Sequence, residues 1–217
     1  MRIFQIGAGG NIGRRLSHLL VQAGDDVTGM HRAPEQASSI SATGAAPLLG
    51  DLVSDSVEAL AEKMAGHDAV VFSAGAHGAG QEKTTLIDGL GLEKAADAAI
   101  KAGVDRFVLV SAFPESERAK NLGDDFEHYM RTKKTADVYL SATDLDWVIV
   151  RPGMLSEERG TGLVSAGFAV EYGHVSRDNV AAVIAALLHE RAVSRVIFEL
   201  TDGTTPFSDA LAHLASR

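Results

Sequence analysis

Short apolar runs alternate with longer segments of helical periodicity along most of this 217-residue chain. In the first repeat, an apolar run at residues 1–6 ends at glycine, and residues 11–23 then carry apolar side chains three and four positions apart. The same pattern predicts further strands at residues 27–31, 47–50, 69–72, 107–110, 147–150 and 196–200. It predicts further helices at residues 34–40, 55–65, 82–102, 124–141 and 177–190, with a last helix opened by Thr205-Pro206.

This alternation predicts parallel strands joined by right-handed helical crossovers, hence an α/β fold with a doubly wound, Rossmann-type sheet. We expect one domain over residues 1–217, because no repeat or linker divides the chain. Residues 152–217 are expected to form a small substrate-side portion of that domain. Within it, residues 152–168 are rich in Gly, Ser and charge and are predicted to be a loop or lid. Asp55 and Glu58, three apart, are expected to form a capping box for the third helix.

Composition and charge narrow the classes of function. Hydrophobic residues make up 46% and charged residues 23%, as in soluble globular proteins, and the net charge of -9 argues against a nucleic-acid partner. No apolar run approaches the ~20 residues of a membrane span, so we expect no membrane association. Cysteine is absent, which fits a cytoplasmic location and removes thiol chemistry. No His, Asp and Glu spacing resembles a metal site, and no metal is expected.

A glycine-rich turn follows the first strand directly and opens the first helix. It reads Gly7-Ala8-Gly9-Gly10-Asn11-Ile12-Gly13. In such a turn the first glycine permits the tight bend, the second lets the backbone approach a pyrophosphate, and the third lets helix pack on strand. The helix N-terminus adds free N–H groups and partial positive charge. The spacing alone occurs by chance, and the alternative is a turn without a ligand, but its position predicts a dinucleotide site.

The end of the second strand bears on which dinucleotide binds. NAD sites usually carry an acidic residue there, but this chain has His31 and Arg32. The guanidinium of Arg32 could hold a 2′-phosphate, so NADP is expected over NAD, although Arg32 could also be a solvated turn residue. Further cofactor contacts are expected from the ends of the third and fourth strands. These are Asp51, which could equally be a turn residue, Leu52, Ser73, Ala74 and Gly75.

Tyr129 and Lys133 are four residues apart on a predicted helix and therefore share one face. A neighbouring ammonium favours the phenolate and lowers the pKa of a tyrosine, which suits acid–base work on an alcohol or carbonyl. Ser111 ends the fifth strand, at the sheet edge where ligands of such folds bind. There it could orient a substrate carbonyl. The alternatives are an exposed helix face for the pair and a loop-capping role for Ser111.

Together these residues resemble the short-chain dehydrogenase/reductases, specifically the small atypical branch that is NAD(P)H-binding and epimerase- or dehydratase-like. The resemblance extends over nearly the whole chain and includes the strand that ends in Arg151-Pro152-Gly153. It implies Ser111, Tyr129 and Lys133 as the catalytic set, with Lys133 also on the cofactor ribose. The asparagine that many relatives carry on the long central helix has no counterpart; Asp88-Gly89 stands near that place.

We therefore expect an NADP-dependent oxidoreductase that interconverts a carbonyl and an alcohol on a small substrate. Only 66 residues follow Arg151, fewer than sugar-nucleotide enzymes of this family use, so a substrate with a diphosphate handle is not expected. A homodimer through the helices at 82–102 and 124–141 is compatible with the sequence. Two alternatives stay open: a non-catalytic NADP(H)-binding redox sensor, and an NADPH-dependent flavin or quinone reductase that does not need Tyr129.

Overall fold

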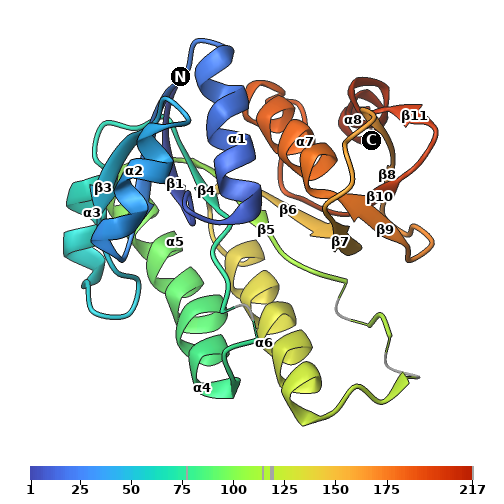
Figure 1. The fold of residues 1–217 in the computed structure, drawn as a ribbon, viewed down its shortest axis with the longest axis horizontal. Coiled ribbons are helices and arrows are strands. Elements are labelled where there is room, and N and C mark those ends of the chain that lie inside the picture. Colours follow the sequence, from blue (N-terminus) through green and yellow to red (C-terminus); the bar gives the residue numbers. More distant parts are fainter. Residues whose placement is uncertain (77, 114, 118–119, 217) are drawn as a thin grey trace.

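A nine-stranded sheet crosses the whole molecule in a computed structural model, which describes residues 1–76, 78–113, 115–117 and 120–216 (Figure 1). The strand order is β11-β8-β10-β6-β5-β4-β1-β2-β3. The strands are β1 (Arg2–Ile6), β2 (Asp26–His31), β3 (Ala46–Leu49), β4 (Ala69–Phe72), β5 (Arg106–Val110), β6 (Asp146–Pro152), β8 (Leu163–Gly167), β10 (Val196–Asp202) and β11 (Thr205–Pro206). All pairings from β3 to β10 are parallel, whereas β8 and β11 are antiparallel to their neighbours.

The central strands are buried at every position, because helices cover both faces of the sheet. The chain order reverses between β1 and β4, which are neighbours in the sheet. In doubly wound folds the crevice at such a switch point, beyond the carboxyl ends of the strands, is where ligands bind. The predicted fold class is confirmed.

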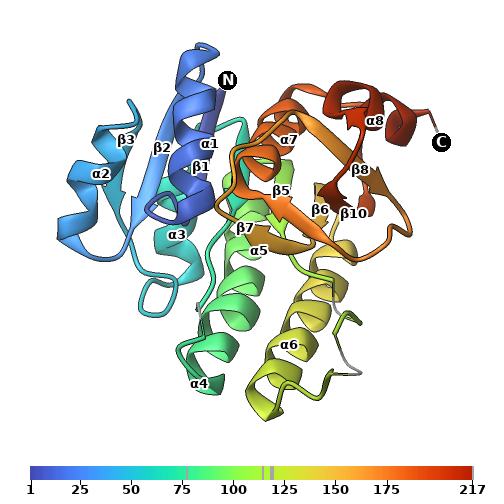
Figure 2. The ribbon, with the colours of Figure 1, turned by 45° about the vertical axis from the view of Figure 1, so that its right-hand side comes forward.

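Helices form one layer on each face of the sheet. They are α1 (Asn11–Gln22), η1 (Pro34–Gln36), α2 (Ala37–Ser41), α3 (Val57–Met64), α6 (Asp124–Ser141), α7 (Arg177–His189) and α8 (Phe207–Ala215). Apolar side chains of α1, α2, α7 and α8 share one core, and those of α3, α5 and α6 share the other. Figures 1 and 2 show α1 and α7 side by side on one face. No helix in the described part of the chain is long and apolar enough to span a bilayer.

The helix predicted at residues 82–102 is interrupted. It consists of α4 (Gln81–Thr84), a π-helical turn η2 (Thr85–Gly89) and α5 (Leu90–Ala102). The predicted helical segment and its end at Gly103 are confirmed, but the segment is not a regular α-helix throughout, because a π-helical turn contains an extra residue that apolar periodicity does not reveal. Such turns are frequent at functional sites, and this one carries Asp88 into the molecule, where only 2% of the residue is exposed.

The segment predicted as a loop or lid at residues 152–168 also differs, because it contains strands. β7 (Met154–Ser156) pairs in parallel with β9 (His174–Ser176), and β8 joins the main sheet beside β10. These strands are short, and each pairs with a segment remote in sequence, so local composition alone suggests a loop. Nearer the N-terminus, the cap of α3 is Ser56, whose Oγ accepts a hydrogen bond from the Ala59 N–H, and not Asp55.

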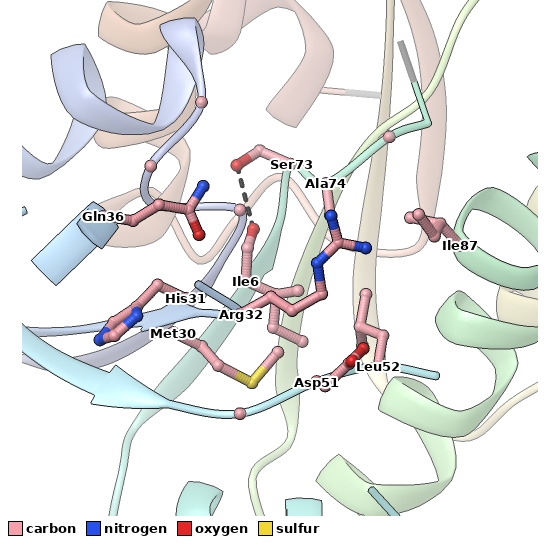
Figure 3. Close-up of a pocket in the computed structure, with 15 residues that line it drawn as sticks. Ile6, Met30, His31, Arg32, Gln36, Asp51, Leu52, Ser73, Ala74 and Ile87 are labelled. Carbon is pink, nitrogen blue, oxygen red and sulfur yellow. Dashed lines mark hydrogen bonds between the residues drawn. The ribbon is translucent and has the colours of Figure 1, made fainter. Parts of the chain in front are cut away.

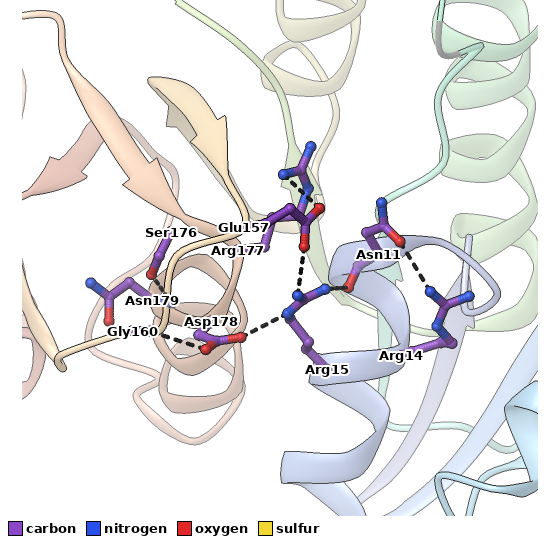
Figure 4. Close-up of polar contacts among 9 residues, drawn as sticks. All are labelled: Asn11, Arg14, Arg15, Glu157, Gly160, Ser176, Arg177, Asp178 and Asn179. Carbon is purple, nitrogen blue, oxygen red and sulfur yellow. Dashed lines mark hydrogen bonds and ion pairs between the residues drawn. The ribbon is translucent and has the colours of Figure 1, made fainter.

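A group of ion pairs joins α1 to the segment after β7 and to the start of α7 (Figure 4). The Arg15 guanidinium donates to Asp178 Oδ1 at 2.7 Å and to Glu157 Oε2 at 2.8 Å. Arg177 Nη1 lies 2.9 Å from the other Glu157 oxygen, and the Gly160 N–H donates to Asp178 Oδ2. One side chain of α1 therefore holds both the segment after β7 and the beginning of α7.

Candidate cofactor and active site

The glycine turn between β1 and α1 is too tightly packed to accept side chains at two of its positions. Gly7 has φ +89°, and a Cβ there would lie 2.6 Å from the Ala74 nitrogen. A Cβ on Gly13 would lie 2.2 Å from the Gly7 carbonyl oxygen. At Gly10 the shortest such distance is 3.2 Å, and this glycine lines an open pocket. The first and third glycines thus serve packing, and the second faces the space where a ligand would lie.

The N-terminus of α1 offers backbone donors to that space. Within this fully described helix, Gly10 is the N-cap, no side chain caps it, and the first turn has no acidic residue. Unpaired N–H groups and the positive end of the helix dipole favour an anion such as a pyrophosphate. A cradle of this shape fits a dinucleotide.

The pocket beside the turn has a volume of about 290 Å³ and lies at the ends of β1, β2, β3 and β4 (Figure 3). It is lined by most of the residues predicted to bind the cofactor: Gly7, Gly10, His31, Arg32, Asp51, Leu52, Ser73, Ala74 and Gly75. Arg32 is exposed and extends from β2 over the pocket. Ile12 lines the next cavity instead, and Asn11 lies outside the lining of both, its Oδ1 accepting a hydrogen bond from Arg14.

Three of these side chains are held by backbone atoms. His31 Nδ1 lies 3.0 Å from the Ala33 oxygen, and Ser73 Oγ donates to the Ile6 oxygen at 3.1 Å. Asp51 Oδ1 accepts from the Val53 N–H at 2.9 Å, so this carboxylate shapes its own turn while it also lines the pocket.

Gln36 also lines this pocket and was not predicted. Its Oε1 accepts from the Ala33 N–H, and its amide nitrogen would lie 3.2 Å from a Cβ on Gly9. A glutamine two residues after Pro34, in the first turn of a predicted helix, is a capping pattern that could have identified it.

A second cavity of about 470 Å³ continues from the first, sharing Ser73, Ala74 and Gly75. It brings together the three predicted catalytic residues, Ser111, Tyr129 and Lys133. The rest of its lining is mostly apolar or glycine: Ile12, Ala76, Gly78, Gly80, Thr84, Asp88, Val110, Leu122, Asp125, Phe126 and Leu155.

Ser111 and Lys133 are buried in the wall of this cavity, with exposures of 5% and 3%. The Ser111 hydroxyl makes no hydrogen bond of good geometry among the described residues, but it lies close enough to the Asp137 carboxylate to lower its pKa. Lys133 Nζ donates to the Val110 oxygen at 3.0 Å and lies 3.7 Å from Asp88 Oδ1. Tyr129, one turn earlier on α6, is partly buried.

The expected effect of Lys133 on Tyr129 is not found. Burial, the negative charges of Asp88 and Asp137, and Tyr172 raise the pKa of Tyr129 above its ordinary value of 10. Sequence spacing placed the ammonium near the phenol, but it could not show that carboxylates from other positions lie there as well. The raised pKa favours the protonated phenol of Tyr129.

Two buried carboxylates therefore belong to the site although they were not predicted as site residues. Asp88 Oδ2 accepts from the Ala76 N–H at 2.9 Å, which fixes the loop after β4. Asp137, on the same helical face as Tyr129 and Lys133, receives the Arg151 Nε–H at 2.9 Å. Burial raises the pKa of Asp137, while Ser111 and Arg151 oppose that rise. The spacing of four residues from 129 to 133 to 137 was the available signal.

Comparisons with known proteins agree with this geometry. The model of a family described as NAD(P)H-binding matches residues 7–191. A Bacillus subtilis protein described as an uncharacterized sugar epimerase is 41% identical over 216 residues, covering 99% of this chain and 100% of the relative. A Bacillus halodurans structure, provisionally assigned as an NAD-dependent epimerase/dehydratase, has a TM-score of 0.90 and 33% identity, covering 99% and 100% of the two chains. A Lactococcus lactis oxidoreductase structure has a TM-score of 0.86 and 28% identity, covering 100% and 98%.

Proposed function

Since this chain belongs to the NAD(P)H-binding family, we propose that it is an NADP(H)-dependent oxidoreductase that interconverts a carbonyl and an alcohol on a small substrate. One observation carries the proposal. The pocket beside the glycine turn runs at Ser73–Gly75 into the cavity that contains Ser111, Tyr129 and Lys133. A dinucleotide bound along the first would therefore direct its nicotinamide into the second.

Two parts of the chain are assigned to the phosphate groups of the cofactor: the start of α1 and Arg32. The amides at the start of α1, beside Gly10, bind the pyrophosphate, because no side chain caps that helix and its first turn contains no acidic residue. Arg32 binds the 2′-phosphate, and no acidic residue stands at the end of β2 to favour a free ribose hydroxyl. NADP is therefore preferred over NAD. Bound NADPH would supply a hydride to the substrate, and NADP would remove one.

The reacting oxygen of the substrate is handled by three side chains. Ser111, which lines the cavity, donates a hydrogen bond to the substrate oxygen and orients it. Tyr129 exchanges the proton with that oxygen, and Lys133 holds the ribose side of the cofactor. The cavity lining is mostly apolar, which fits a small, uncharged substrate. A cytoplasmic location and a homodimer through α5 and α6 stay predictions.

The cofactor assignment is tested by fluorescence titration of the protein with NADPH and, separately, with NADH. We expect NADPH to bind at least about tenfold more tightly, and Arg32→Ala to remove most of that difference. Lys83→Ala, a change on α4 outside the pocket lining, is a matched control that should retain the preference. Equal affinities for the two cofactors in the unmodified protein would contradict the role of Arg32, and failure of both to bind would contradict the function.

The acid–base assignment is tested by Tyr129→Phe, assayed as NADPH oxidation with a panel of aldehydes, ketones and quinones. We expect NADPH affinity to be retained and carbonyl turnover to fall by about 10² or more. Tyr139→Phe removes a phenol of α6 that is bonded to Asp97 and lies outside the cavity lining, so it serves as the control. Flavin-dependent NADPH oxidation that survives Tyr129→Phe would instead favour a flavin or quinone reductase. Tight NADPH binding without turnover of any acceptor would favour a redox sensor.

A further inference from the structure

The ammonium of Lys133 is paired inside the protein. Its Nζ donates to the Val110 oxygen and lies 3.7 Å from Asp88 Oδ1, and both charged side chains are almost fully buried. A buried charge needs a partner of opposite sign, because the interior screens it poorly and solvates it weakly. Asp88 supplies that partner from η2, a different element of the fold.

Asp88 itself is held from two directions. Its Oδ2 accepts the Ala76 N–H at 2.9 Å. Its Oδ1, the oxygen nearer Lys133, would lie only 3.1 Å from a Cβ on Gly75, so the chain beside it is closely packed. The π-helical turn at residues 85–89 contains the backbone of Asp88. The carboxylate is thus fixed between the end of the cofactor pocket and Lys133.

The charged groups around Tyr129 come from several elements, and together they carry no net positive charge. Asp88 approaches from η2, Lys133 and Asp137 from α6, and Tyr172 from the segment before β9. Asp137 is paired with Arg151 on β6 at 2.9 Å. The two buried carboxylates thus offset the two cations, and the mouth of the cavity adds the acidic Asp125. An ammonium that is already neutralised gives little stabilisation to a phenolate.

On the basis of the proposed function, we propose that Asp88 is a positioning residue that neutralises Lys133 and keeps Tyr129 protonated, so that the site is built to reduce carbonyls. In that direction the carbonyl carbon accepts a hydride, with its electron pair, from NADPH. The carbonyl oxygen takes the proton as the O–H bond of Tyr129 breaks. The products are the alcohol and NADP⁺, and water returns the proton to Tyr129. The raised pKa of Tyr129, caused by its burial and then by Asp88, agrees with this arrangement.

The experiment is a pH titration of the protein labelled with ¹³C at the tyrosine Cζ, followed by NMR. The chain has three tyrosines, Tyr129, Tyr139 and Tyr172, and the Tyr129→Phe variant assigns the signal. In the unmodified protein we expect Tyr129 to ionise above pH ~10, the value for a free phenol. Asp88→Asn should lower the pKa of Tyr129 by about 1–3 units, because the ammonium is then uncompensated. Asp88→Glu, which keeps the charge, should restore the high value.

Asp97→Asn is the matched control. Tyr139 donates a hydrogen bond to Asp97 at 2.7 Å, and this bond raises the pKa of Tyr139 to about 12. The control should lower the pKa of Tyr139 and leave that of Tyr129 unchanged. If Asp88→Asn does not fold, as judged by circular dichroism, the titration of the unmodified protein still decides.

Ionisation of Tyr129 at or below pH ~10 in the unmodified protein would overturn the proposal, as would a folded Asp88→Asn variant with an unchanged Tyr129 pKa. The titration needs neither substrate nor turnover, so its failure is distinguishable from that of the proposed function. Absence of NADPH binding beside a high Tyr129 pKa would contradict only the function. NADPH-dependent carbonyl reduction beside an ordinary or low Tyr129 pKa would contradict only the role of Asp88.

Discussion

Gly13→Ala and Gly10→Ala should separate the packing role of the glycine turn from its binding role. A Cβ on Gly13 would meet three backbone atoms, the Gly7 oxygen at 2.2 Å and the Cα and oxygen of Ala8 at 2.9 Å. Backbone atoms cannot rotate aside, so we assign the upper end of the overpacking range, about 3 kcal/mol. The helix propensity of alanine returns about 1 kcal/mol. The expected net loss in the free energy of unfolding is about 2 kcal/mol.

Gly10→Ala should behave differently. Gly10 has φ -76° and ψ 171°, which any residue adopts, and its Cβ would meet only the Gly7 oxygen at 3.2 Å. We expect the free energy of unfolding to change by less than about 1 kcal/mol, the cost of a poorer N-cap. The new methyl group would, however, occupy the space of the bound pyrophosphate. NADPH affinity should therefore fall by about tenfold or more, which is about 1.4 kcal/mol.

Urea unfolding measures the free energy of unfolding, and fluorescence titration measures NADPH affinity. Both measurements are made on both variants. We expect the two variants to differ in opposite ways. Gly13→Ala should lose mainly stability, and Gly10→Ala should lose NADPH affinity without loss of stability. If Gly10→Ala bound NADPH as tightly as the unmodified protein, the pyrophosphate would not approach this backbone. If Gly13→Ala were as stable as the unmodified protein, the close contact of α1 with the turn would be refuted.

Two further predictions concern stability. Ser56→Ala should lower the free energy of unfolding by about 0.5–2 kcal/mol in urea, because the Ala59 N–H loses its cap, whereas Ser56→Thr should retain most of it. The Gly160 N–H, and then Arg15, hold the pKa of Asp178 below its usual value. Ionised Asp178 therefore contributes to the free energy of unfolding. This contribution is complete above about pH 4, the pKa of an unfolded aspartate, and is lost as pH falls through the lower pKa of Asp178 in the folded protein. Urea unfolding between about pH 5 and 2 should thus be less pH-dependent for Asp178→Asn; unchanged pH dependence would contradict the role of Asp178.

The sheet was predictable because its parallel strands are mostly apolar, as in β4, and an amphipathic segment follows most of them. Strands that are buried on both faces consist mainly of apolar residues, so the sequence shows where they are. The edge of the sheet was not predictable by the same means. β8 is half exposed and contains Ser165 and Gly167, and its partner β10 lies about thirty residues later. Its strand conformation depends on pairing, which local composition does not encode.

The site was predictable where one element supplies both position and chemistry. The glycine turn, the end of β5 and the Tyr129–Lys133 spacing are of this kind, and the structure brings these residues to two adjoining cavities. The features of the site that the sequence did not predict depend on contacts between several elements. Asp88 lies in the π-helical turn η2 and comes within 3.7 Å of Lys133, and the pKa of Tyr129 is raised by burial and then by carboxylates on two different elements.

Both outer strands of the sheet contain a proline, and this limits how the molecule can associate. Pro47 lies in β3 and Pro206 in β11, and β11 has only two residues. Proline has no N–H to donate to an added strand, and short edge strands offer few other donors. Growth of the sheet from chain to chain, the usual route to β-aggregation, is thus opposed at both ends. Contacts between copies through helix surfaces, in contrast, would not extend the sheet, because backbone pairing cannot propagate there.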